Sequence, residues 1–150
     1  MSQTQNPCTQ QTQTTTQQRR EIIEAYGNYK LYREYNPEES GFRLVKEYRL
    51  PRGDMCEVYR HIIEIYDNDV LRVAELHAVD RGGENLYGGN GYSPLGTKLE
   101  PCSLKKVRDF MLRVKSVQQF DELMHWLLTA KYVTQPCAVM AIESTKEPSF

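Results

Sequence analysis

The stretch that decides the fold is CEVYRHIIEIYDNDVLRVAELHAV, residues 56–79. Two arms rich in Val, Ile and Tyr flank the segment 67–69, whose Asn and Asp residues tolerate the left-handed backbone of a tight turn. A three-residue loop places Glu64 opposite Arg72, a charge-compatible cross-strand pair. The stretch therefore predicts a β-hairpin. In that register one face, which we expect to point to the core, carries Ile63, Ile65, Leu71 and Val73.

Strand signals continue on the N-terminal side of this hairpin. Residues 42–50 alternate apolar and charged side chains, which predicts a half-buried strand. Residues 21–35 carry both helical and strand signals, and Gly27 argues against an uninterrupted helix. We expect a short helix at 19–26 followed by a strand at 28–35. Residues 1–18 are mostly Gln and Thr without charge, which predicts a disordered tail ahead of a single domain at 19–150.

The C-terminal half begins with glycines and continues with helical periodicity. The glycines of residues 80–96 predict a long, mobile loop. Apolar residues at helical spacing in 103–132 predict two antiparallel helices. Ser103 is placed to cap the first helix, and Ser116 with Gln119 resembles a capping box that opens the second.

The order of these elements defines the expected fold class. Residues 138–142 predict a short buried strand, and residues 146–150 are expected to fray. Strands come first and helices follow, which is typical of an α+β fold. We expect a mostly antiparallel sheet of four or five strands, with a helical hairpin at about 103–132 packed on one face.

Composition narrows the classes of function. The formal net charge is −1, so binding to nucleic acid requires local charged patches. No apolar run approaches the roughly 20 residues of a membrane helix, and no secretory signal is evident, which predicts an intracellular protein with no membrane partner. Catalytic and nucleotide-binding signatures are absent from the sequence. We therefore expect a non-enzymatic binding protein that needs no cofactor.

Nucleic acid is the first partner that the charged and aromatic residues suggest. The strands carry arginines that could contact phosphates, and the Gly-rich segment carries tyrosines that could stack on bases. The helical stretch 103–116 has a local charge of +4. A helix-turn-helix reader is disfavoured, because Asp121 and Glu122 open the second helix. The predicted contact residues are Arg43, Arg49, Arg52, Arg60, Arg81, Tyr87, Tyr92, Lys105, Lys106 and Arg113, and the tyrosines expected to be exposed are Tyr32, Tyr87 and Tyr92.

Three other hypotheses remain open. The hairpin register brings His61, Glu75 and His77 to one face, where they could bind a divalent metal in a hydrolase, although an ordinary charge pair explains them as well. An antiparallel helical hairpin would bring Cys102 near Cys137, within reach of a disulfide. Exposed sheet edges and tyrosines could instead serve a protein-interaction or assembly module, such as a homodimer.

Overall fold

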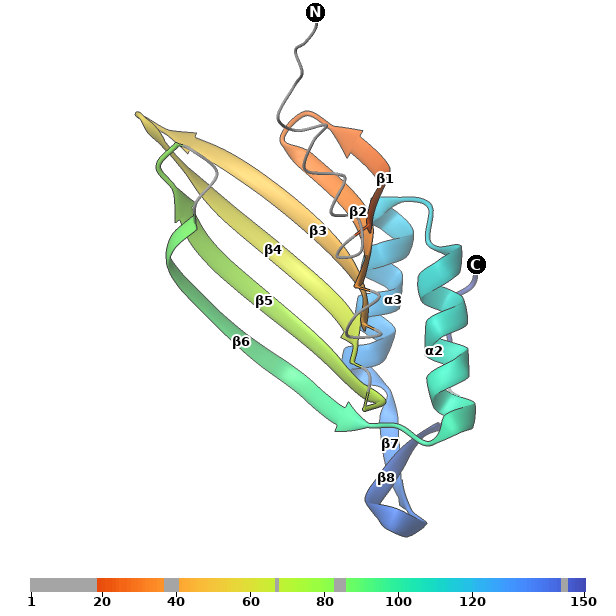
Figure 1. Ribbon diagram of the computed structural model, residues 1–150. Coiled ribbons are helices and arrows are strands. Elements are labelled where there is room, and N and C mark those ends of the chain that lie inside the picture. Colours follow the sequence, from red (N-terminus) through yellow and green to blue (C-terminus); the bar gives the residue numbers. More distant parts are fainter. Residues whose placement is uncertain (1–18, 37–40, 67, 83–85, 144–145) are drawn as a thin grey trace, which may run out of the picture.

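The computed structural model describes residues 19–36, 41–66, 68–82, 86–143 and 146–150. Six strands form one antiparallel sheet in the order β1-β2-β3-β4-β5-β6, and two helices lie together on one of its faces (Figure 1). The α+β prediction is confirmed, with six strands where four or five were expected. The elements are β1 (Arg19–Tyr26), β2 (Tyr29–Asn36), β3 (Gly41–Arg52), β4 (Met55–Ile65), β5 (Val70–Asp80), β6 (Leu86–Lys98), α2 (Pro101–Arg113), α3 (Val117–Thr129), β7 (Lys131–Gln135), η2 (Pro136–Ala138) and β8 (Val139–Glu143).

The β4–β5 hairpin has the predicted register. Glu64 faces Arg72, and Ile63 faces Val73. Asp69 adopts a φ of 65°, the left-handed conformation expected of the turn. The four apolar residues assigned to the core face are all fully buried, namely Ile63, Ile65, Leu71 and Val73.

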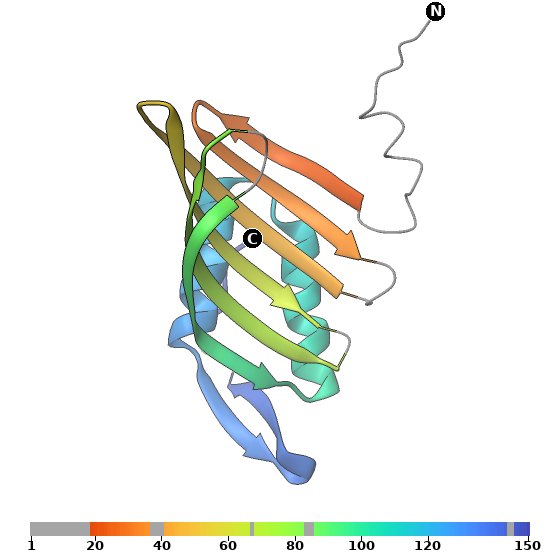
Figure 2. The same ribbon diagram turned by 60° about the vertical axis from the view of Figure 1, so that its left-hand side comes forward.

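The sheet has two faces with different coverings, which Figure 2 shows with the helices behind the strands. The helix-side face packs its apolar residues against the stripes of α2 and α3, among them the fully buried Val107, Met111 and Phe120. Among the described residues, no helix lies over the open face (Figure 2). It nevertheless buries a small apolar strip of Tyr32, Val45, Ile62 and Ala74.

Residues 19–26 form strand β1, so the helix predicted there is wrong. A register shift between Ile22 and Glu24 marks a bulge in the strand. Alternation along the strand leaves Ile22 exposed and packs Ile23 against the core, and the extra residue of the bulge lets Glu24, opposite Leu31, face the helices as well. Adjacent isoleucines fit a helical face equally well, and the structure resolves this ambiguity through contacts with α3.

The Gly-rich segment also differs from its prediction. Residues 86–98 form β6, an edge strand that pairs with β5, where a loop was expected. Its glycines allow close packing, since a Cβ on Gly91 would lie 2.1 Å from the Leu76 side chain and 3.1 Å from the Glu75 carbonyl oxygen. The low strand propensity of glycine therefore led to the wrong prediction of a loop in this segment.

The two helices are confirmed, and their caps are confirmed in part. Ser116 caps α3 by accepting a hydrogen bond from the Gln119 amide at 3.2 Å. Glu100, and not Ser103, caps α2. The Ser103 hydroxyl instead accepts a hydrogen bond from the Ile142 amide, which ties α2 to β8.

The C-terminal region is more ordered than expected. The helical prediction extended to residue 132, but α3 ends at Thr129 and β7 begins at Lys131. The strand predicted at 138–142 is observed as β8, but it is not a buried strand, since only Ile142 among its residues is buried. Residues 146–150 do not fray: the Phe150 ring lies edge-on to Phe110, with 5.6 Å between the ring centroids.

Candidate binding surfaces

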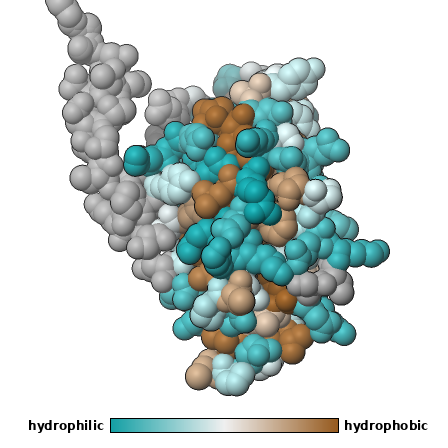
Figure 3. Space-filling view, turned by 90° about the vertical axis from the view of Figure 1, so that its right-hand side faces the viewer, coloured by the Kyte–Doolittle hydropathy of each residue, from teal (hydrophilic) through white to brown (hydrophobic). Residues whose placement is uncertain are grey.

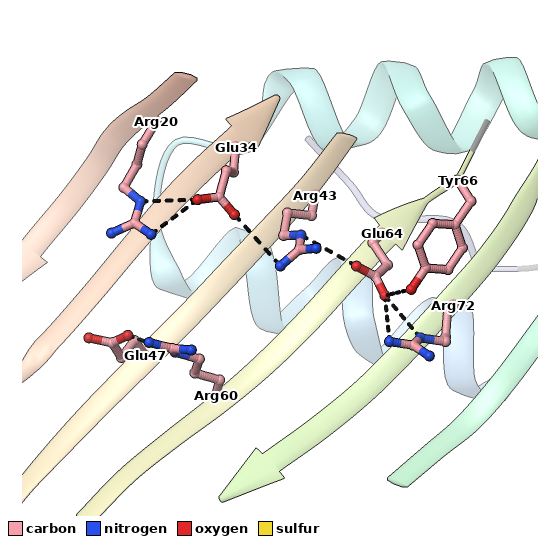
Figure 4. Close-up of polar contacts among 8 residues, drawn as sticks. All are labelled: Arg20, Glu34, Arg43, Glu47, Arg60, Glu64, Tyr66 and Arg72. Atoms are coloured by element: carbon pink, nitrogen blue, oxygen red, sulfur yellow. Dashed lines mark hydrogen bonds and ion pairs between the residues drawn. The ribbon is translucent and has the colours of Figure 1, made fainter. Parts of the chain in front are cut away.

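A row of alternating charges crosses the open face from β1 to β5 (Figure 4). Glu34 accepts hydrogen bonds from Arg20 and lies 3.6 Å from Arg43. Glu64 contacts Arg43 at 3.4 Å and Arg72 at 2.8 Å. These five residues occupy directly opposed positions on successive strands. We call them the arginine ladder.

A second ionic cluster lies on the same face around Glu47. This carboxylate accepts hydrogen bonds from Arg49 at 2.9 Å and from Arg60 at 2.8 Å. Burial raises the pKa of Glu47, but the two arginines together outweigh it and hold the pKa below its usual value. Arg49 also contacts Asp80 at 2.8 Å.

The carboxylates and the arginines of the open face differ in how deeply their side chains are buried. The side chains of Glu34, Glu47 and Glu64 are only 4–7% exposed, whereas those of the paired arginines are 26–47% exposed. The carboxylates therefore lie beneath the guanidinium groups. Each arginine contacts a buried carboxylate, and because five arginines share three glutamates and Asp80, this set of side chains keeps a small net positive charge.

The predicted nucleic-acid residues of the sheet do not form one surface. Arg43, Arg49 and Arg60 share the open face, but Tyr92 lies on the helix-side face, where its hydroxyl donates to Glu75. Arg52 is the last residue of β3, where it pairs with Glu57, and Arg81 follows the last residue of β5. The side chain of Tyr87, like residues 1–18, lies outside the described part of the chain.

Tyr32 is buried, contrary to expectation. It is 2% exposed, and the Arg20 guanidinium covers its ring at 4.1 Å from the centroid. The arginine ladder thus lies over buried apolar side chains. Long arginine side chains seal them from water, as expected of amphipathic side chains.

The cations of α2 lie on the outer side of the helical layer, which faces the viewer in Figure 3 and is largely hydrophilic. Lys105 pairs with Asp109 at 3.0 Å, and Lys106 pairs with Glu147 at 2.7 Å. Arg113 lies over the Phe110 ring. The same stretch carries two more cations, Arg108 and Lys115.

A cavity of about 300 Å³ adjoins this surface of α2. It lies between the helix and the C-terminal segment. Three cations and two carboxylates line it together with a thiol and a phenyl ring: Cys102, Lys105, Lys106, Asp109, Phe110, Arg113 and Glu147. Its charges are largely matched within the cavity, so it adds to the α2 surface without being a separate site.

The histidines of the proposed metal site are divided between two glutamates. His61 Nε2 lies 3.3 Å from Glu75, as the register predicts, but His77 Nε2 lies 3.1 Å from Glu57. Within the described ranges no three His, Cys, Asp or Glu side chains are grouped to hold a metal. The arrangement is that of two separate histidine–glutamate contacts.

The proposed disulfide is not formed. Cys102 and Cys137 are both free and exposed, although they flank the helix pair as expected. The β7–β8 hairpin lies between the end of α3 and Cys137, so the simple return of a helical hairpin does not set their separation.

A row of aromatic side chains on the helix-side face escaped the sequence interpretation. Tyr29, Tyr48, Tyr59 and His77 are direct neighbours on β2 to β5. The Tyr29 and Tyr48 rings lie 4.7 Å apart, and His77 stacks on Tyr59 at 4.5 Å. We call these four residues the tyrosine row. Extending the hairpin register to β2 and β3 would have revealed it.

Comparisons with known proteins identify no relative: no family model, no curated protein and no solved structure matches the chain. Among the helices of the described residues, none is long and apolar enough to cross a membrane.

Proposed function

We propose that the chain is a non-enzymatic nucleic-acid-binding protein, and that the outer surface of α2 contacts the phosphate backbone. The observation that carries the proposal is the cluster of cations between residues 105 and 115. Asp109 and Glu147 are the acids that pair with them. Such a cluster supplies a local positive field on a chain whose formal net charge is −1.

The open face supports this role less well than α2 does. Its arginines already pair with carboxylates that are buried beneath them, and a phosphate would have to compete with those carboxylates. Removing a buried carboxylate from its partner is costly, so the competition favours the existing pairs. The surface of α2 has fewer such pairs, and its Lys105–Asp109 pair is exposed, where ion pairs are weak.

The second helix, α3, is less suited than α2 to contacts with the phosphate backbone. Asp121 pairs with Lys46 of β3, and Glu122 accepts hydrogen bonds from Ser149. The start of α3 is thus held within the protein. This favours phosphate contacts that are independent of base sequence over a reading helix in the major groove.

The test compares two double variants that remove the same charge. Lys105→Gln with Arg108→Gln alters the α2 surface, whereas Arg52→Gln with Arg81→Gln alters the far end of the sheet. Fluorescence anisotropy with labelled duplex DNA, single-stranded DNA and RNA is measured across a series of salt concentrations. We expect the α2 pair to weaken binding by about tenfold or more and to reduce the salt slope for duplex DNA by about 2, since each phosphate contact contributes roughly 0.9.

The control pair should change both quantities little. Three results would contradict the proposal: no binding by the wild type at about 50 mM salt, affinity that does not change with salt, or equal losses in the two double variants.

A further inference from the structure

The two helices cover only part of the helix-side face. In Figure 1 the far ends of β3, β4 and β5 extend well beyond α2 and α3. The tyrosine row lies in this uncovered part, and its side chains are accordingly accessible: Tyr29 is 42% exposed and Tyr59 is 37% exposed. Tyr92 of β6 adds a third exposed ring beside the row, at 60%.

This uncovered region combines aromatic rings with carboxylates and their basic partners: Glu57 contacts Arg52 and His77, and Glu75 contacts His61. The Tyr59 hydroxyl donates to Glu57 at 3.0 Å, and the Tyr92 hydroxyl donates to Glu75 at 2.7 Å. These hydrogen bonds raise the pKa of both tyrosines above a value that already keeps the rings neutral at physiological pH. Electron-rich rings next to carboxylates favour a guanidinium ligand, which stacks on the rings and donates to the acids.

The opposite face of the same strands presents guanidinium groups. Arg60 of β4 donates from Nε to Glu47, which leaves its two terminal nitrogens for other acceptors. Leu76, its cross-strand neighbour on β5, is 37% exposed. Arginines that are already held by buried carboxylates suit a protein interface, where Arg is enriched, better than a polyanion that would have to displace those carboxylates.

We infer that the partner of each face is the other face of a second copy of this chain, so that copies stack head to tail through their sheets. Arg60 and Leu76 of one copy would lie against the tyrosine row and Glu75 of the next. The two surfaces are complementary in charge and both are uncovered within the described residues. Stacked sheets pack about 10 Å apart, which is close enough for guanidinium groups to stack on the rings.

The sheet edges are less suitable for self-association than these faces. The outer strand β1 is bulged between Ile22 and Glu24, and β6 contains Pro94 and two register shifts against β5. Bulges and proline are devices that discourage edge-to-edge pairing. Because the contacting faces differ, the contact is heterologous, and it continues into rings or open stacks and does not stop at a symmetric dimer.

The test uses one variant on each face and a matched control. Leu76→Glu alters the open face, Tyr59→Ser alters the tyrosine row, and Leu128→Glu places the same charge on an exposed residue of α3. Sedimentation velocity is measured without nucleic acid over a wide range of protein concentration. We expect the wild type and Leu128→Glu to form species larger than dimers, and each face variant to raise the dissociation constant at least about tenfold, with thermal unfolding showing that each variant is folded.

Mixing the two face variants gives the sharpest result. Each retains one intact face, so an equimolar mixture should form dimers and nothing larger. A wild type that stays monomeric at the highest concentration, face variants that assemble like the wild type, or a mixture that yields no dimer would each overturn the inference. The Lys105→Gln/Arg108→Gln variant should assemble normally, which separates this inference from the proposed nucleic-acid function.

Discussion

The Nη2 nitrogen of Arg33 on β2 lies 2.9 Å from the carbonyl oxygen of Val114, the C-cap residue of α2. The same nitrogen lies 3.2 Å from the carbonyl oxygen of Leu112, while Nη1 pairs with Glu21 of β1. A buried cation therefore supplies donors to the end of a helix, where backbone carbonyls lack intrahelical partners and the dipole favours positive charge.

Replacing Arg33 with Leu should lower the free energy of unfolding by about 3 kcal/mol, because each buried acceptor left without a donor costs about 1–3 kcal/mol. Urea denaturation monitored by circular dichroism measures the change. Arg81→Leu removes an exposed arginine and should stay within about 0.5 kcal/mol of the wild type. An equally small effect at Arg33 would show that water replaces its contacts.

Glu47 should make stability depend on pH in the acid range. Its pKa in the folded protein is below its usual value, so its contribution is present above about pH 4.3 and is lost as the pH falls through the folded-state pKa. Glu47→Gln does not titrate. The difference in unfolding free energy between wild type and Glu47→Gln should therefore shrink from pH 6 to pH 3. A difference that is constant with pH would refute this account, and Glu143→Gln on the exposed end of β8 serves as the control.

Gly91 and Gly96 of β6 should respond differently to alanine. A Cβ at Gly91 meets the Leu76 side chain and the Glu75 carbonyl, whereas a Cβ at Gly96 meets nothing within 4 Å. Gly91→Ala should destabilise the protein by about 1–3 kcal/mol through overpacking. Gly96→Ala should be neutral or stabilising by up to about 1 kcal/mol. Thermal unfolding distinguishes them, and adding Leu76→Ala should recover part of the loss at Gly91.

Glu24 connects β1 to the start of α3. Its Oε1 accepts a hydrogen bond from the Val117 amide at 2.9 Å, next to the Ser116 cap. Ser116→Ala should cost about 1 kcal/mol, and Glu24→Gln should cost about the same, since hydrogen bonds to charged groups are worth about 1.5–3 kcal/mol and the amide retains part of this one. A double-mutant cycle in urea should show coupling, because both side chains serve one helix end. Strict additivity would contradict this.

The sequence predicts the β4–β5 register and the two helices correctly because each depends on neighbours in the chain. A single charge match, Glu64 with Arg72, was enough to choose the loop length. The wrong predictions concern segments whose structure depends on contacts between residues far apart in the sequence. Residues 19–26 are a strand because Glu21 reaches Arg33 and Glu24 reaches α3, and neither contact leaves a local signal.

The candidate surfaces likewise combine features that the sequence predicts with features that depend on distant contacts. The positive charge of residues 105–115 is evident in the sequence, but its position on the layer opposite the open face depends on how the helices pack. The pairing of His61 with Glu75 follows from the hairpin register. The contact of His77 with Glu57 in place of Glu75 could not be predicted, because two glutamates lie within reach of one imidazole.

Edge strands usually open first, since only one side of their backbone is paired. β1 differs because three of its side chains contact other elements. Arg20 binds Glu34 of β2, and Glu21 binds Arg33, whose guanidinium contacts the end of α2. Glu24 binds the first turn of α3. Peeling β1 away would therefore remove the Glu24 contact from the first turn of α3 and the Glu21 contact from Arg33, the residue that holds the end of α2. Amide protons of β1 and of the first turn of α3 should then exchange with solvent as one cooperative unit, at a rate set by the unfolding of the whole domain.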